Sequence, residues 1–335
     1  MVGISDIKAA NARLTASTVP RVSVFVGGTS GIGKATIRRL ASTGFPVKIY
    51  VVGRKSTRPA MEPFLDDLRA ANPLADLIWI EGEVALLSEV KRICRDIEAA
   101  ESSLDLLFLS AGYAPLGGTR NDTPEGLETT HALQYYGRIL FTLLLLPLLR
   151  ASSSPRVISV LAGCFLSGSI DNDDINLDKP GAFGGFASQA RIGTLNTVGL
   201  DHLAADPENA SVTFMHSWPG AVNTGNMARY WKPSTFSFFP WTEFLKPLFF
   251  FMGISHEDSA EKHLYQVTSG TFGGDGPKID GVQAVNTTGS QGHGLFLLDD
   301  KCEVSYKAKS LDKLRTNSQA AVWAKTTEIL KPYLE

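Results

Sequence analysis

Short apolar runs alternate with longer amphipathic segments along the first two thirds of the chain. The apolar runs are rich in β-branched residues, which is typical of strands buried in a sheet. Strands are predicted at residues 22–26, 47–52, 76–81, 104–110, 156–161 and 211–216. Between these runs, apolar positions recur at helical spacing. Helices are predicted at residues 5–16, from 31 onward, and at 62–71, 87–99, 124–149 and 185–204.

Strands that alternate with helices at this spacing predict an α/β fold with a parallel, doubly wound sheet. Helices then cover both faces in a three-layer α/β/α arrangement, and ligands bind beyond the carboxyl ends of the strands. We expect a single domain over residues 1–335, because the hydrophobic content of 44% suffices for one large core. Its parts are predicted as a core at 21–224, an aromatic-rich lid at 225–270, a C-terminal extension at 271–335 with a glycine-rich loop at 270–294, and a closing helix at 311–330.

Composition narrows the class of protein. The formal net charge is −2, so nothing favours a nucleic-acid-binding surface. The three cysteines are far apart without metal-ligand spacing, so we expect no metal, and their sparse use suits a reducing compartment. The N-terminus lacks the apolar run of a signal peptide, and residues 139–149 are apolar but too short to span a bilayer. We therefore expect a cytoplasmic protein without a transmembrane segment.

The most informative stretch is residues 21–40, a predicted strand, a glycine turn and the start of a helix. Gly27, Gly31 and Gly33 have the spacing G-x-x-x-G-x-G. A helix that begins at such a turn presents unpaired backbone N–H groups and the positive end of its dipole to an anion. The turn is therefore predicted to bind the pyrophosphate of a dinucleotide. An ordinary glycine-rich turn is the alternative, because a glycine pattern alone is weakly specific.

The residues V-G-G-T-S-G-I-G at 26–33 resemble the T-G-x-x-x-G-x-G turn of the short-chain dehydrogenase/reductase family, with Val26 in the place of Thr. Three further stretches are similar to that family: E-G-E-V at 81–84, S-A-G at 110–112 and P-G-A-V-N-T at 219–224. The resemblance covers roughly residues 22–224. It implies a Rossmann-type fold, a nicotinamide cofactor and carbonyl or alcohol chemistry.

The resemblance also assigns the contacts to the cofactor. Val84 would flank the adenine, and Val222 and Thr224 would hold the nicotinamide carboxamide. The residues that these motifs place at the cofactor are Gly27, Thr29, Ser30, Gly31, Ile32, Gly33, Val84, Ser110, Ala111, Gly112, Pro219, Gly220, Val222 and Thr224.

The charge after the second strand distinguishes the two nicotinamide cofactors. An acid about 20 residues beyond the glycines would bind the ribose 2′-hydroxyl of NAD(H). Here the strand ends with Gly53, followed by Arg54, Lys55 and Arg58, and no acid is present. Guanidinium and ammonium groups favour a phosphate, so the sequence predicts NADP(H). A solvated basic loop is the alternative.

The match to the family breaks at the catalytic residues. The family uses a Tyr as general acid/base, a Lys four residues later and a Ser after the fifth strand, but this chain contains no Y-x-x-x-K sequence. The Ser position falls on Ala162, and the Asn that the family keeps on its fourth helix falls on Gln134. Two ungapped registers place at the Tyr and Lys positions either Gln189 and Gly193 or Ala187 and Arg191. We therefore expect a divergent member of the family.

Several side chains are candidates for replacement chemistry: Gln134, Tyr113, His131, Cys164, Ser188, Gln189 and Arg191. His131, Gln134 and Arg138 share one helix face, where Gln134 should point at the site. His131 could donate a proton near neutral pH, although a helix histidine is more often structural. Tyr113 could reach the nicotinamide side or serve in packing.

The remaining candidates lie after the predicted fifth strand and on the predicted helix at 185–204. Cys164 follows the fifth strand, where substrate would sit, with a small buried residue as the alternative interpretation. Ser188 and Arg191 lie near the vacated Tyr and Lys positions. Arg191 could stabilise an oxyanion but cannot donate a proton at neutral pH.

Residues 230–251 contain ten aromatic side chains directly after the P-G-A-V-N-T stretch. In the family this position usually carries the substrate-covering segment, so the cluster indicates a bulky hydrophobic substrate. The alternatives are a subunit interface, as in a homodimer, or contact with a membrane surface. Three prolines interrupt the cluster and exclude a spanning helix.

The middle of the chain is also similar to fungal short-chain dehydrogenase-like proteins found with secondary metabolism, on the strings SAGYAPLGG, TPEGLE, YYGR, SVLAG and FMHSWPG. The predicted function is an NADP(H)-dependent oxidoreductase that reduces a carbonyl or an activated double bond of a hydrophobic small molecule. One alternative is a non-redox enzyme of the same fold, an isomerase, cyclase or dehydratase. The other is a non-catalytic nucleotide-binding protein.

Overall fold

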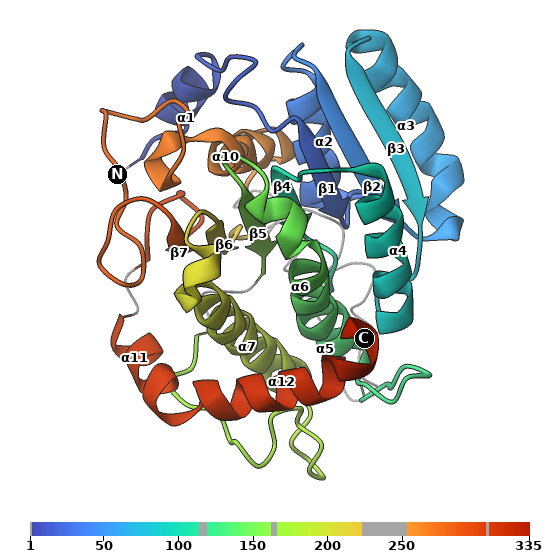
Figure 1. Ribbon diagram of the computed structural model, residues 1–335, viewed down its shortest axis with the longest axis vertical. Coiled ribbons are helices and arrows are strands. Elements are labelled where there is room, and N and C mark those ends of the chain that lie inside the picture. The colour runs from blue at the N-terminus through green and yellow to red at the C-terminus, as the bar shows by residue number, and fades with distance from the viewer. Residues whose placement is uncertain (1, 114–118, 162–165, 223–252, 306–307) are drawn as a thin grey trace, which may run out of the picture.

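A parallel sheet of seven strands forms the centre of the computed structural model, which describes residues 2–113, 119–161, 166–222, 253–305 and 308–335 (Figure 1). The strand order is β3-β2-β1-β4-β5-β6-β7. The strands are β1 (Val22–Val26), β2 (Val47–Gly53), β3 (Ala75–Glu81), β4 (Leu106–Leu109), β5 (Arg156–Val160), β6 (Thr213–Ser217) and β7 (Gly294–Leu298). The predicted doubly wound parallel sheet is confirmed.

Strand β7 is the one element of the sheet that the pattern did not predict. It pairs in parallel with β6, from Thr213 opposite Gly294 to Ser217 opposite Leu298. The strand begins at Gly294, the last residue of the stretch predicted as a glycine-rich loop, and continues to Leu298. A short apolar run after many glycines carries little periodic signal, and its burial comes from pairing with a strand that lies far away in the sequence.

Helices cover both faces of the sheet, which confirms the three-layer arrangement (Figure 1). Two clusters of buried hydrophobic side chains lie on opposite faces. One face carries α1 (Ile4–Asn11), α2 (Gly31–Ala41), α3 (Arg58–Ala71) and α10 (His256–Thr268). The other face carries α4 (Leu87–Ala100), α5 (Thr129–His131), α6 (Gly137–Arg150), α7 (Gly185–Ala205), α11 (Ala308–Asn317) and α12 (Gln319–Leu334).

The long helix predicted after β4 is interrupted. Between α5 and α6, residues Ala132–Tyr136 form a π-helical turn. Gly137 follows that turn, and a Cβ at this position would lie 2.9 Å from the carbonyl oxygen of Ala132 and 3.1 Å from that of Val84. The helical stretch Thr129–Arg150 is long and apolar enough to cross a membrane, but 72% of its most apolar window is buried inside the fold. We therefore assign it to the core, as predicted.

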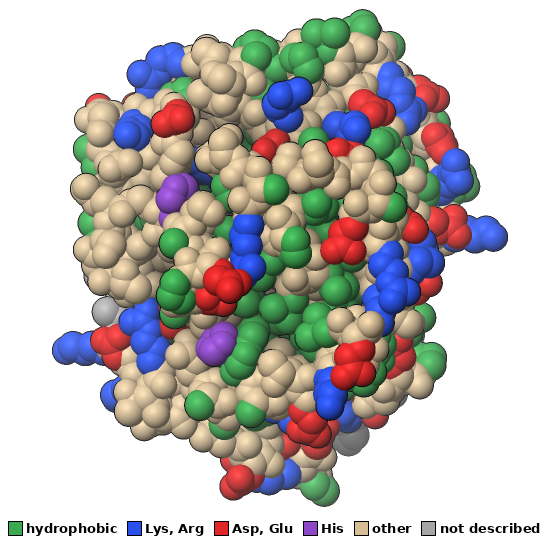
Figure 2. Space-filling view, in the orientation of Figure 1, with side chains coloured by type: hydrophobic (Ala, Val, Ile, Leu, Met, Phe, Trp, Pro, Cys, Tyr) green, Lys and Arg blue, Asp and Glu red, His purple; other side chains and the backbone are tan. Residues whose placement is uncertain are grey.

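The C-terminal third differs from the prediction in two places. Helix α10 falls in the segment predicted as a lid, yet it packs against α1 and α2, so residues 256–268 belong to the core layer. The aromatic residues predicted to form the lid lie outside the described residues. The closing helix is two helices, α11 and α12, that meet at Ser318. On the face shown in Figure 2, positive and negative side chains are interspersed around a hydrophobic centre.

Candidate functional site

The glycine turn after β1 lies against the end of β4. The amide groups of Ser110 and Ala111 both donate to the carbonyl of Val26, at 2.8 and 3.0 Å. Gly27 has φ of +100°, and a Cβ there would lie 2.3 Å from the backbone nitrogen of Ala111. A Cβ on Gly33 would lie 2.5 Å from the carbonyl oxygen of Gly27. Glycine is therefore required at both positions, because backbone packs directly on backbone.

Helix α2 begins inside this turn. Gly31 is its first residue and has φ of +53°. Ser30 caps the helix in an extended conformation without a side-chain hydrogen bond to the helix. Thr29, Ser30 and Ile32 are partly exposed. The N-terminus of α2 can therefore offer backbone N–H groups to an anion, at the carboxyl edge of the sheet where dinucleotides bind.

Two exposed cations follow β2 on the same edge. No carboxylate of the described residues pairs with Arg54 or Lys55, whereas Arg58 forms an ion pair of 2.8 Å with Glu62. Gly53 lets this edge close tightly, because a Cβ there would lie 2.3 Å from the indole ring of Trp79. The end of β2 thus presents Arg54 and Lys55 to solvent beside the glycine turn.

Two glutamine amides from different helices converge on one carbonyl oxygen. Nε2 of Gln134, in the π-helical turn, donates to the carbonyl of Tyr113 at 2.9 Å. Nε2 of Gln189, on α7, lies 3.5 Å from the same oxygen. Both side chains are buried. Gly112 allows this approach, since a Cβ there would lie 2.7 Å from Oε1 of Gln134. The structure therefore brings together three of the predicted candidates.

A buried arginine that is not among the predicted site residues lies beneath this group. Nη1 of Arg138 donates to Oγ of Ser159 at 2.7 Å and to the carbonyl of Val160 at 2.9 Å. Nη2 donates to the carbonyl of Ala111 at 2.8 Å. Burial lowers the pKa of Arg138 to about 9, which still leaves the guanidinium charged at neutral pH. An arginine inside an otherwise apolar helix was the signal that could have identified it.

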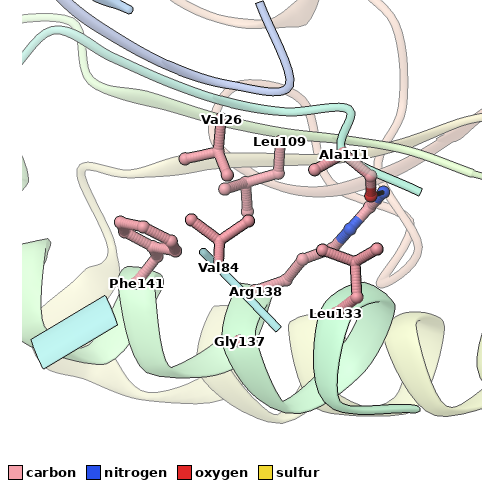
Figure 3. Close-up of a pocket in the computed structure, with 8 residues that line it drawn as sticks. All are labelled: Val26, Val84, Leu109, Ala111, Leu133, Gly137, Arg138 and Phe141. Carbon is pink, nitrogen blue, oxygen red and sulfur yellow. Dashed lines mark hydrogen bonds between the residues drawn. The ribbon is translucent and has the colours of Figure 1, made fainter. Parts of the chain in front are cut away.

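A hydrogen-bonded chain continues from Arg138 to the π-helical turn. Ser159 donates to Oδ1 of Asn196 at 3.0 Å, and Nδ2 of Asn196 donates to the backbone carbonyl of Gln134 at 2.7 Å. Figure 3 shows Arg138 running along the wall of a narrow pocket toward Ala111. Val84 lies on the opposite wall of that pocket. The chain fixes the helix backbone beneath the converging amides.

His131 and Ser188 belong to a separate buried cluster. Nδ1 of His131 and Oγ1 of Thr130 both lie against Oε2 of Glu128, at 2.9 and 2.6 Å. Thr130 also contacts Oγ of Ser188 at 3.1 Å. Burial raises the pKa of Glu128, but the hydrogen bonds from His131 and Thr130 outweigh it, and the net shift is downward. These contacts join the start of α5 to α7.

The other predicted residues are distributed around the site. Arg191 donates to the backbone carbonyls of Asp174 and Ile175, so its guanidinium holds the loop before α7. The segment after β6 is fixed by a bridge between Val222 and Ile254. Pro219 and Gly220 precede this bridge, and Gly220 has φ of +70°. Cys164 and Thr224 lie outside the described residues.

Comparison with known proteins identifies the family. A sequence model described as short chain dehydrogenase matches residues 21–168. The chain is 33% identical to oxidoreductase AN1596 of Emericella nidulans, over 98% of both chains. It is 30% identical to the short-chain dehydrogenase/reductase SAT2 of Stachybotrys chartarum, over 67% of this chain and 66% of that one.

The fold agrees with solved structures of the same class. A crystal structure of NADPH-bound carbonyl reductase from chicken fatty liver superposes with a TM-score of 0.55 at 15% identity, over 85% of this chain and 98% of that one. The Pseudomonas aeruginosa RhlG/NADP complex gives a TM-score of 0.57 at 16% identity, over 85% and 97%. These structures agree with the chain in fold, and the sequence similarities to the short chain dehydrogenase model and to SAT2 show that the chain belongs to the short-chain dehydrogenase/reductase superfamily.

Proposed function

We propose that the protein is an NADP(H)-dependent reductase that acts on a carbonyl or an activated carbon–carbon double bond of a hydrophobic small molecule. The observation that carries the proposal is the convergence of the Gln134 and Gln189 amides on one oxygen beside the glycine turn. In parallel α/β sheets this edge is where a nucleotide and its reaction partner meet. The relatives named oxidoreductase support a redox step over the alternatives.

The residues present fit a nicotinamide dinucleotide. A Cβ at Gly27 or Gly33 would collide with the backbone of Ala111 or Gly27, so only glycine lets the turn close against the end of β4 and leaves the N-terminus of α2 at the carboxyl edge of the sheet. The N-terminus of α2 would hold the pyrophosphate, and Arg54 with Lys55 would hold a 2′-phosphate. Val84, the Ser110–Gly112 turn and the segment from Pro219 to Thr224 would line the rest of the site. When bound, the cofactor supplies a hydride.

The two glutamines act as an oxyanion hole in this proposal. A carboxamide N–H can stabilise a negative oxygen but cannot give up its proton at neutral pH. Hydride addition leaves a negative charge on the substrate oxygen, either as an alkoxide or as the enolate of a conjugated ketone. Gln134 and Gln189 would stabilise that charge, and water would supply the proton. Both amides lie against the carbonyl oxygen of Tyr113, which shows that their N–H groups can reach one oxygen together.

A non-redox enzyme of the same fold is the second candidate, because the chain lacks the Tyr-x-x-x-Lys pair. An isomerase or dehydratase would use the same amides without consuming the cofactor. The absorbance of NADPH, followed with a panel of hydrophobic ketones and enones, separates the two. Products that form without any loss of NADPH would contradict the reductase and support the second candidate.

Cofactor choice is tested with a matched pair of variants on the β2 edge. Arg54→Asp removes a cation that no carboxylate of the described residues pairs with, and adds a negative charge, so we expect the preference for NADP⁺ over NAD⁺ to fall about tenfold or more. Arg58→Asp is the control, because Arg58 already pairs with Glu62. Calorimetric titration gives both dissociation constants. An unchanged preference in Arg54→Asp would contradict the assignment of this residue to the 2′-phosphate.

A further inference from the structure

Arg138 carries an isolated charge in the protein interior. Its side chain is 3% exposed, and no carboxylate of the described residues pairs with it. Three hydrogen bonds to uncharged oxygens hold Nη1 and Nη2, whereas Nε has no hydrogen-bond partner in the described part of the chain. An unpaired buried charge is costly to the folded state. Its place in this fold therefore needs a reason beyond stability.

The position of the charge supplies that reason. Ser159 and Val160 are at the carboxyl end of β5, and Ala111 follows the carboxyl end of β4. The guanidinium thus bridges two neighbouring strand ends directly under the turn of Ser110–Gly112. Figure 3 shows it reaching Ala111 along the pocket wall. In the proposed function, the nicotinamide end of the cofactor would lie on the other side of that turn. The inference about Arg138 depends on that proposed function.

The two redox forms of the cofactor differ in charge at this end. The nicotinamide ring is positively charged in the oxidised form and neutral in the reduced form, while the phosphates carry the same charge in both. We propose that Arg138 is a fixed cation beneath the cofactor site that favours the binding of NADPH over NADP⁺. The arginine would thereby load the enzyme for reduction and help to release the oxidised cofactor afterwards.

The expected size of the effect follows from Coulomb's law. Two unit charges roughly 8 Å apart, in a medium with an effective dielectric constant of about 20, interact strongly enough to change a dissociation constant by about tenfold or more. Counterions screen a buried pair less than a surface pair. We therefore expect removal of the Arg138 charge to shift the ratio of the NADP⁺ and NADPH dissociation constants about tenfold toward NADP⁺.

The experiment measures this ratio by calorimetry in the wild type and in three variants. Arg138→Met removes the charge, Arg138→Lys keeps it, and Arg156→Met removes another buried guanidinium at the far end of β5. The ratio is insensitive to partial unfolding, because a smaller fraction of folded protein raises both apparent dissociation constants by the same factor. We expect only Arg138→Met to shift the ratio, with Arg138→Lys close to the wild type.

A fourth variant, Ser159→Asp, keeps the test decisive if Arg138→Met does not fold. Ser159→Asp places a carboxylate on Nη1 of Arg138 and compensates its charge, so we expect the same direction of shift. A wild type that binds NADP⁺ as tightly as NADPH would overturn the proposal, as would an unchanged ratio in Arg138→Met or Ser159→Asp. Failure of either cofactor form to bind the wild type would instead contradict the proposed function.

Discussion

Arg138 and Arg156 lie at opposite ends of β5, and both guanidinium groups are buried without a carboxylate partner among the described residues. Arg156, at the amino end, donates to the carbonyls of Gln266, Ser269 and Gly273, each at 2.7 Å. Those carbonyls end α10 and start the loop behind it. Arg138, at the carboxyl end, holds two strand ends together at the candidate site.

The two arginines show what position in the fold adds to a side chain. Burial lowers the pKa of Arg156 to about 10 and that of Arg138 to about 9, so both stay charged at neutral pH. The amino edge of a parallel sheet binds no ligand in this fold class, whereas the carboxyl edge does. Arg156 therefore only connects β5 to the end of α10, whereas Arg138 lies where its charge can act on the candidate site.

The largest effect is expected for the arginines themselves. Arg156→Met leaves three buried carbonyls without a donor, and we expect a loss of about 5 kcal/mol in the free energy of unfolding. Arg138→Met should cost a similar amount, because it also frees three acceptors. Urea denaturation followed by tryptophan fluorescence measures both. A change in cofactor preference in Arg156→Met would contradict the conclusion that only Arg138 affects the charge at the site.

Alanine substitutions of glycines at the carboxyl and amino edges of the sheet should also differ in their effects on stability and NADPH binding. Gly27→Ala adds a Cβ that clashes with the backbone of Ala111 at a residue with φ of +100°, and we expect a loss of about 4 kcal/mol together with loss of NADPH binding. Gly44, at the amino edge, has φ of +78° but no atom within 4 Å of an added Cβ. Gly44→Ala should cost only about 1 kcal/mol and leave NADPH binding intact. Equal losses of binding in the two variants would contradict the role of the Gly27 contact.

A smaller, pH-dependent effect is expected from His263 on α10. Nδ1 donates to the carbonyl of Ser259 at 2.7 Å, and the ring packs edge-on against Phe108. Burial lowers the pKa of His263 to about 4, because it outweighs the hydrogen bond to Ser259, which raises the pKa. Between about pH 6.5 and pH 4, His263 is protonated in the unfolded chain but stays neutral in the folded chain. Stability should therefore fall by roughly 3 kcal/mol as the pH drops from about 6.5 to 4.

His263→Phe tests this dependence, because it keeps the aromatic packing and removes the titrating ring. We expect the variant to lose most of the acid destabilisation between pH 6.5 and 4, as measured by thermal unfolding at several pH values. His256→Gln is the control on the same helix, since His256 is exposed. A variant as acid-sensitive as the wild type would show that other groups set the pH dependence.

The strands and most helices could be predicted because their signal is local. β-Branched runs such as residues 47–52 mark buried strands, and glycines with fixed spacing mark the turn after β1. Strand β7 and helix α10 were missed because their identity depends on pairing and packing with distant segments. The series of hydrogen bonds from Arg138 through Ser159 to Asn196 was missed for the same reason. No period or spacing connects a helix, a strand end and a second helix across some sixty residues of sequence.

The candidate site could be predicted in part. Gln134 was found from the family's motif on the helix after the fourth strand and Gln189 from one of two possible registers, and the structure places both amides at one oxygen. Their roles stay predictions, and the Arg54 and Gly27 variants above test two of the predicted cofactor contacts. His131 and Ser188 shared a predicted region with them, yet the structure joins these two through Glu128 and Thr130. Side-chain partners of this kind depend on tertiary contacts.

The π-helical turn at Ala132–Tyr136 gives the helix after β4 two rotational phases. A π turn contains one residue more than the α-helical period, so the residues behind it are rotated by roughly 100° relative to a continuous helix. The phase before the turn is set by the Glu128 cluster, and the phase behind it by the packing of α6 on the sheet. Deleting one residue of the turn would merge the phases, and Gln134 and Arg138 could then no longer both keep their present directions.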